Sequence, residues 1–139
     1  MIVADTSGLL SAFDESQLQH AAARAFLDAE RGPIVLSPFV LAELDYLTTR
    51  DAGVVAELAL LDELSSGGYL LASFDVQDLM SARRVIARYR DLRIGLTEAS
   101  LVVLADRYRT NRIFTLDERH FRALEPLAGG TFELLPADA

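Results

Sequence analysis

The 139-residue sequence contains no cysteine and no lysine. Without cysteine, the protein has no disulfide framework, no thiolate zinc site and no cysteine nucleophile. Without lysine, it has neither a P-loop, which needs a lysine to reach the phosphates, nor the amine with which Schiff-base enzymes bind their substrates. All thirteen basic residues are therefore arginine.

Long apolar runs are also absent. No stretch approaches the roughly 18 consecutive apolar residues of a membrane span, and the first residues lack the basic flank and the length of a signal peptide. We therefore expect a soluble, cytoplasmic protein that does not enter a membrane. The hydrophobic fraction of 51% provides the apolar surface for a core, and the length agrees with a single domain over residues 1–139, since domains have roughly 100 to 200 residues.

Positive charge is scarce and unevenly distributed. The formal net charge of −8 argues against a surface that binds polyanions everywhere. However, residues 1–70 carry three arginines against eleven acids, whereas residues 83–122 carry ten arginines against five acids. The acidic chain thus contains a basic segment, which is a candidate for contacts with phosphate groups.

Short apolar runs alternate with helical patterns along the whole chain. The runs predict strands at residues 2–4, 34–36, 69–72 and 112–115, with an edge strand at 131–135. Helices are predicted over residues 8–13, 17–30, 38–50, 52–64, 76–89 and 97–108, with a short one ending near residue 124. In the helix over 17–30, Ala21, Ala25 and Leu27 are expected to point inward. Because parallel strands need crossover connections, this alternation predicts an α/β fold with helices on both faces of a mostly parallel sheet.

Four acidic residues occupy positions that suggest a common site. Asp5 and Asp117 each follow an apolar strand, and the carboxyl ends of parallel strands form the edge at which open α/β sheets bind ligands. On helical projections, Glu43 falls at the edge of an apolar stripe, and Glu98 falls among the inward positions of the helix over 97–108. We expect the four carboxylates to converge at one edge of the sheet.

The negative charges of carboxylates that lie this close together need to be compensated. If the strands before Asp5 and Asp117 are neighbours, about 4.8 Å apart, their charges repel each other. In a partly dry crevice, such repulsion either raises one pKa or is relieved by a bound cation. We favour the cation. A set of hard oxygen ligands without cysteine selects Mg²⁺ or Mn²⁺ over zinc or copper.

Each acid also has a purely structural explanation. An aspartate after a strand is often the N-cap of the next helix. Glu43 can reach solvent from the edge of its helix, and Glu98 suits a first helical turn because of the helix dipole. His20 and His120 are expected to be surface or packing residues. Convergence of four acids on one edge favours a functional site over four separate explanations.

Four segments together resemble a known family. They are residues 3–10 (VADTSGLL), 37–44 (SPFVLAEL), 89–100 (YRDLRIGLTEAS) and 115–121 (TLDERHF). In order and spacing, over nearly the whole chain, they resemble a PIN domain and, more narrowly, the VapC toxin ribonucleases of bacterial toxin–antitoxin pairs. The resemblance implies a three-layer α/β/α sandwich and a magnesium-dependent endoribonuclease.

The resemblance also implies a ligand set. Asp5, Glu43 and Asp117 match the first, second and fourth acids of the family pattern. Glu98 stands where the family usually has aspartate, so the third acid is one methylene longer in this chain. Asp91, at another position that is often acidic, ranks second as a metal ligand.

Hydroxyl groups close to these acids are expected to orient them. Thr6, Ser7 and Thr115 are candidate donors, although ordinary capping explains them equally well.

Partners follow from the resemblance as well. It implies an RNA substrate, a homodimer and a cognate VapB-like antitoxin whose tail enters the acidic groove. The arginine-rich segment would supply phosphate contacts. The alternative from another class is a catalytically weak PIN-like module that binds RNA or a protein and uses its acids only for structure.

Overall fold

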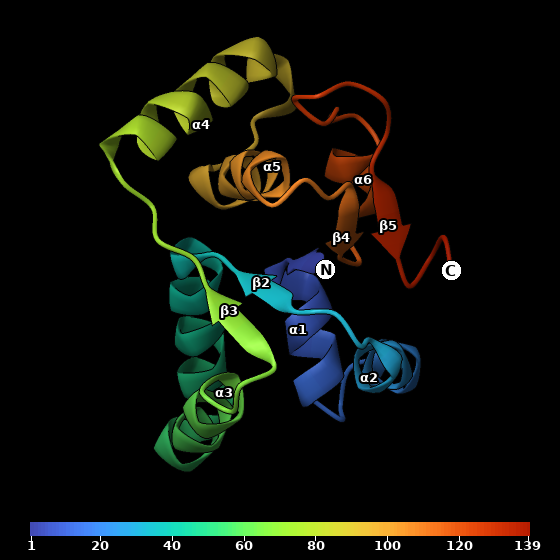
Figure 1. Ribbon diagram of the computed structural model, residues 1–139. Coiled ribbons are helices and arrows are strands. Elements are labelled where there is room, and N and C mark those ends of the chain that lie inside the picture. Colours follow the sequence, from blue (N-terminus) through green and yellow to red (C-terminus); the bar gives the residue numbers. More distant parts are fainter.

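The computed structural model describes all residues from 1 to 139 and places five strands in one sheet (Figure 1). The strands are β1 (Ile2–Ala4), β2 (Ile34–Leu36), β3 (Tyr69–Leu71), β4 (Arg112–Phe114) and β5 (Glu133–Leu135). Their order is β3-β2-β1-β4-β5, and each neighbouring pair is parallel. The predicted parallel sheet is confirmed, and β5 is an edge strand as expected.

Helices cover both faces of this sheet. They are α1 (Thr6–Phe13), α2 (His20–Ala29), α3 (Pro38–Leu64), α4 (Val76–Arg88), α5 (Leu96–Arg107) and α6 (Glu118–Phe121), with a 3-10 turn, η1, over Arg90–Leu92. Figure 1 shows α1, α2 and α3 on one side of the strands and α4 and α5 on the other. The predicted α/β/α sandwich is therefore confirmed. None of the helices combines the length and hydropathy needed to cross a lipid bilayer.

The core lies around the central strands. Every residue of β1 and β2 is buried, which explains why these strands are continuous apolar runs rather than alternating patterns. Helix α5 is equally enclosed, since all residues from 99 to 105 are buried. Periodicity indicates only one inward face for this helix, but α4 covers its outer face.

Helix α2 differs from its prediction in where it begins and in which face it buries. It begins later than residue 17 because the Asp14 carboxylate accepts hydrogen bonds from the residues that follow, which form a turn instead. Leu27 is buried as predicted, but Ala21 and Ala25 are exposed, and Ala23 is buried in their place. That prediction was wrong because alanine carries little periodic signal, so the contact with α1 decides the face.

Helix α3 consists of two helical segments that meet at Gly53. The residue has φ 84° and ψ −178°, which interrupts the helix and agrees with the two helices predicted on either side. The first segment begins as predicted, with the Ser37 hydroxyl accepting a hydrogen bond from the Phe39 N–H at 3.2 Å and Pro38 in the first turn. The chain direction therefore changes at a position that only glycine adopts without strain.

Replacing this glycine tests the interruption. We expect Gly53→Ala to lower the free energy of unfolding by about 1–3 kcal/mol, because this region of backbone conformation is strained for residues with a Cβ atom. No atom lies within 4 Å of the position that the new Cβ would occupy, so the loss would come from the backbone alone. Urea unfolding measures the change.

Gly68→Ala is the matched control. A methyl group at Gly68 also meets no atom within 4 Å, but this residue has no positive φ. Equal losses of stability in the two variants would contradict the interpretation.

Candidate active site

The carboxyl ends of β1 and β4 bring the first and last acids to the same edge. The two strands pair in parallel with Ala4 opposite Phe114, and the Asp5 N–H donates to the Phe114 carbonyl at 2.9 Å. Asp5 and Thr115, which follow these paired residues, therefore lie next to each other. The strands that precede Asp5 and Asp117 are therefore neighbours, as the predicted convergence of the acids requires.

Asp5 lies at the centre of a hydrogen-bond network. Its Oδ2 atom accepts hydrogen bonds from the Thr115 hydroxyl at 2.8 Å and from the Ser7 hydroxyl at 2.9 Å. Thr115 in turn accepts the Asp117 N–H at 2.9 Å, and Ser7 accepts the Leu116 N–H at 3.0 Å. The two hydroxyl groups thus fix the Asp5 carboxylate and tie it to the segment that carries Asp117.

The third predicted donor does not take part. Thr6 is buried, but its hydroxyl has no hydrogen-bond partner. Ser7 and Thr115 therefore orient Asp5 as predicted, whereas no acid is oriented by the Thr6 side chain.

The Asp5 carboxylate is deeply buried and carries no compensating positive charge. Only 6% of the residue is exposed, and no arginine or histidine forms an ion pair with it. Burial raises the pKa of Asp5, and the negative charge of Glu98 raises it further, while hydrogen bonds from Thr115, Ser7 and the Thr6 backbone act in the opposite direction. A cation would relieve this imbalance.

Glu98, Asp117 and His120 form a second group beside Asp5. One potential ligand atom from each lies within 4.8 Å of the others. The Asp117 carboxylate caps α6, with Oδ1 accepting the His120 N–H at 3.1 Å and Oδ2 in contact with the ring Nδ1 of His120 at 2.7 Å. Glu98 uses Oε2 to accept the Gly95 N–H at 3.0 Å, which leaves Oε1 available. The structural explanations are therefore correct for both acids, N-capping for Asp117 and a position in the first helical turn for Glu98, and they coexist with clustering.

The two remaining predicted ligands, Glu43 and Asp91, lie on the exposed surface. Glu43 is exposed, and its Oε2 is 3.5 Å from the Thr97 hydroxyl, next to Glu98 in the chain. Its carboxylate therefore lies at the start of α5, on the side of the acids. Asp91 is exposed on η1, and no hydrogen bond or ion pair connects it with the other acids. Its role as a ligand stays a prediction.

The histidines differ from each other in their surroundings. His20 contacts the Ser11 carbonyl through Nδ1 at 2.8 Å, which fits the predicted packing role. His120 was expected to do the same but lies among the acids. Its position three residues after Asp117, on the first turn of α6, was the signal in the sequence that places it there.

The sequence matches the family model of the PIN domain over residues 2–125. The chain belongs to the PIN domain family. It is 47% identical over 135 residues to ribonuclease VapC26 of Mycobacterium tuberculosis (strain ATCC 25618 / H37Rv), a match that covers 97% of this chain and 100% of that protein. PIN domains generally depend on a divalent metal ion, and the group around Glu98 is a candidate for binding one.

Solved structures of two further proteins share the PIN fold. VapC20 of Mycobacterium tuberculosis, described as a sarcin-ricin loop cleaving toxin, superposes with a TM-score of 0.78 at 17% identity, covering 84% of this chain and 90% of its own. A toxin–antitoxin complex from Klebsiella pneumoniae gives a TM-score of 0.70 at 15% identity, covering 89% of this chain and 92% of the other.

The unbalanced charge of Asp5 leads to a stability prediction. At neutral pH without divalent metal, we expect Asp5→Asn to raise the free energy of unfolding by about 1 kcal/mol, or roughly 3 °C in Tm, because it removes a buried charge at a functional site. Added Mg²⁺ or Mn²⁺ should stabilise the wild type and not the variant, since only the native state of the wild type binds the ion.

Asp106→Asn, measured by thermal unfolding, is the control for the replacement of an aspartate by asparagine. Asp106 is exposed near the end of α5, and it forms no ion pair, so this variant should keep the metal response of the wild type. An Asp5→Asn protein that is less stable than the wild type in metal-free buffer would show that the carboxylate is well compensated.

Proposed function

We propose that the protein is a metal-dependent endoribonuclease that acts as the toxin of a toxin–antitoxin pair. The observation that carries this proposal is the buried Asp5 carboxylate, beside Glu98 and without a cationic partner. Membership of the PIN family supports it, as does the 47% identity with a named ribonuclease over nearly the full length of both chains.

The donor set fits a hard divalent cation. We assign Asp5 and Glu98 as the residues that hold the ion, with Glu43 and Asp117 completing its shell or positioning water. Carboxylate oxygens favour Mg²⁺, with Mn²⁺ as a second choice. The longer side chain of Glu98 fits this role because one of its oxygens is already used for the Gly95 N–H, which leaves the other to extend toward Asp5.

The chemistry divides between the ion and the side chains. A bound divalent ion would lower the pKa of a water molecule and stabilise the charge that develops on the phosphate. Ser7 and Thr115 hold Asp5 in one orientation, so that the carboxylate needs no rearrangement during the reaction. Glu43, on the exposed side, would orient water for in-line attack, and no covalent protein intermediate is needed.

Chelation and one substitution test the activity. We expect the protein to cleave RNA in Mg²⁺, to lose this activity in EDTA, and to lose at least about 100-fold in rate in Asp5→Asn with the fold intact. Gel-resolved cleavage of defined RNAs provides the measurement, with Asp106→Asn as a variant that keeps the wild-type rate. RNA binding without metal-dependent cleavage would instead favour the catalytically weak binding module.

Six arginines of the basic segment have no ion-pair partner and are candidates for phosphate contacts. Of the ten arginines between residues 83 and 122, Arg88, Arg107, Arg112 and Arg122 form ion pairs with acids. The other six, Arg83, Arg84, Arg90, Arg93, Arg109 and Arg119, form none. Two of these six lie close in the chain to ligands that we propose, because Arg93 precedes the Gly95 that binds Glu98 and Arg119 follows Asp117.

Salt dependence tests these two residues. Each phosphate contact adds about 0.7 to the slope of log affinity against log salt for a single strand. We therefore expect Arg93→Gln and Arg119→Gln each to weaken RNA binding and to reduce this slope by about that amount. Fluorescence anisotropy at several salt concentrations measures both.

Arg31→Gln is the matched control for the arginine variants. Arg31 is also exposed and unpaired, but it precedes β2 and so lies at the opposite edge of the sheet from Asp5. An equal reduction of the slope in this variant would indicate that RNA binds without preference for the acidic edge.

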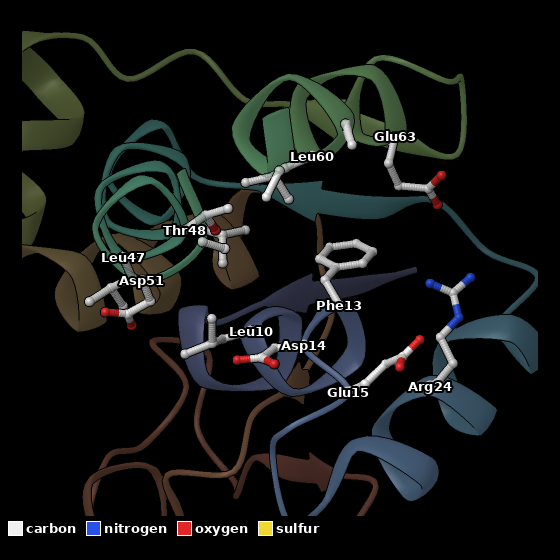
Figure 2. A pocket seen from close by; sticks show the side chains of 14 residues that line it. Leu10, Phe13, Asp14, Glu15, Arg24, Leu47, Thr48, Asp51, Leu60 and Glu63 are labelled. Carbon is white, nitrogen blue, oxygen red and sulfur yellow. The ribbon is translucent and has the colours of Figure 1, made fainter. Parts of the chain in front are cut away.

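A pocket between α1 and the two segments of α3 suits an antitoxin segment. Its volume is about 380 Å³, and Figure 2 shows Phe13 at its centre, with Leu60 of α3 on one side and Leu10 of α1 on the other. Acidic side chains, including Asp51 and Glu63, surround this apolar floor. The one basic lining residue, Arg24, is already paired with Asp28. An amphipathic segment with apolar and basic residues is the complementary partner, and we propose that the antitoxin supplies it.

An exposed apolar surface on the second segment of α3 supports the predicted homodimer. Val54, Val55 and Leu58 are 59%, 79% and 58% exposed. Apolar side chains that gather in this way often mark a protein interface. We propose that this surface is covered in the homodimer.

A further inference from the structure

We propose that His120 contributes a ring nitrogen to the metal site and so raises its affinity for Mn²⁺ selectively. This inference rests on the proposed function, because it concerns the same ion. The four-acid set explains the oxygen ligands, but it leaves unexplained an imidazole whose ligand atom lies within 4.8 Å of those of Glu98 and Asp117.

The spacing of these atoms fits ligands of a single ion. In an octahedral shell with bonds of about 2.1 Å, adjacent ligand atoms lie about 3 Å apart and opposite ones about 4.2 Å apart. The ligand atoms of Glu98, Asp117 and His120 all lie within 4.8 Å of one another. The His120 Nδ1 donates a hydrogen bond to the Asp117 Oδ2 at 2.7 Å, so the ring nitrogen that keeps a lone pair for an ion is Nε2. The three side chains therefore lie close enough to reach one ion after small side-chain movements, with His120 binding through Nε2.

The local structure holds the imidazole at this position. Asp117 caps α6 by accepting the His120 N–H at 3.1 Å, so the histidine lies on the first turn directly after the acid. The next residue, Phe121, is 1% exposed and anchors the short helix in the core. In contrast to His20, which contacts the Ser11 carbonyl, the His120 ring makes no hydrogen bond apart from the contact with Asp117.

A nitrogen ligand changes which ions the site prefers. Carboxylates serve Mg²⁺ and Mn²⁺ alike, whereas imidazole is a better ligand for transition metals than for Mg²⁺. If His120 binds the ion, its removal weakens Mn²⁺ binding much more than Mg²⁺ binding. If it only positions Asp117, its removal weakens both ions to a similar degree, because the same carboxylate is disturbed in either case.

Pulsed electron paramagnetic resonance of the Mn²⁺-loaded protein tests the bond between the ion and the imidazole itself. We expect a nitrogen hyperfine coupling from a directly bound imidazole in the wild type, absent from His120→Gln. Calorimetry should show Mn²⁺ affinity reduced by about 10-fold or more in this variant, with Mg²⁺ affinity changed by less than about threefold. His20→Gln is the control and should keep the coupling and both affinities.

The outcomes separate this inference from the proposed function. Mn²⁺ bound without nitrogen coupling, in a wild type that cleaves RNA, overturns the role of His120 and leaves the nuclease intact. Equal losses of affinity for both ions also overturn it. A wild type that neither binds an ion nor cleaves RNA overturns both proposals. If His120→Gln does not fold, the wild-type spectrum alone decides whether a nitrogen is bound.

Discussion

The hydrogen bonds from Ser7 and Thr115 to Asp5 join two central strands at the point where the proposed site lies. They require α1 to start very close to the end of β4, and the sequence permits this because residue 8 is glycine. A Cβ atom at Gly8 would lie 2.7 Å from the carbonyl oxygen of Phe114. The close approach of α1 to β4 and the orientation of the buried Asp5 carboxylate therefore depend on each other.

Away from this edge, several acidic residues form ion pairs with arginines. Arg112 bridges Glu30 and Glu133 at the beginning of β4, and Arg122 holds Asp138, whose pKa its guanidinium lowers to about 2. The more exposed of these pairs, such as Arg112–Glu133, contribute little to stability individually. The contrast with the acidic edge is informative, because the chain has arginines available and yet no arginine compensates the four acids there. Repulsion retained at one place in a folded protein is typical of a site selected for function rather than for stability.

The sequence predicted those features that follow from topology. Parallel strands place their carboxyl ends at one edge, so the sequence alone predicts that Asp5 and Asp117 lie together, with Ser7 and Thr115 as their neighbours. Which groups pair depends on tertiary contacts that periodicity does not contain. For this reason the buried face of α2, the burial of α5 on all sides and the place of His120 were not predicted. The assignment of individual acids as metal ligands stays a prediction.

The hydrogen-bond network around Asp5 has a consequence for the folding of the chain during its synthesis on the ribosome. Ser7 and Thr115 are 108 residues apart, so the contact order of the site is high and it cannot form until most of the chain has been synthesised. Until β4 emerges, β1 lacks its neighbour on one side and presents an open strand edge, a state that is prone to unwanted pairing. The proposed site therefore stays incomplete throughout most of the chain's own translation.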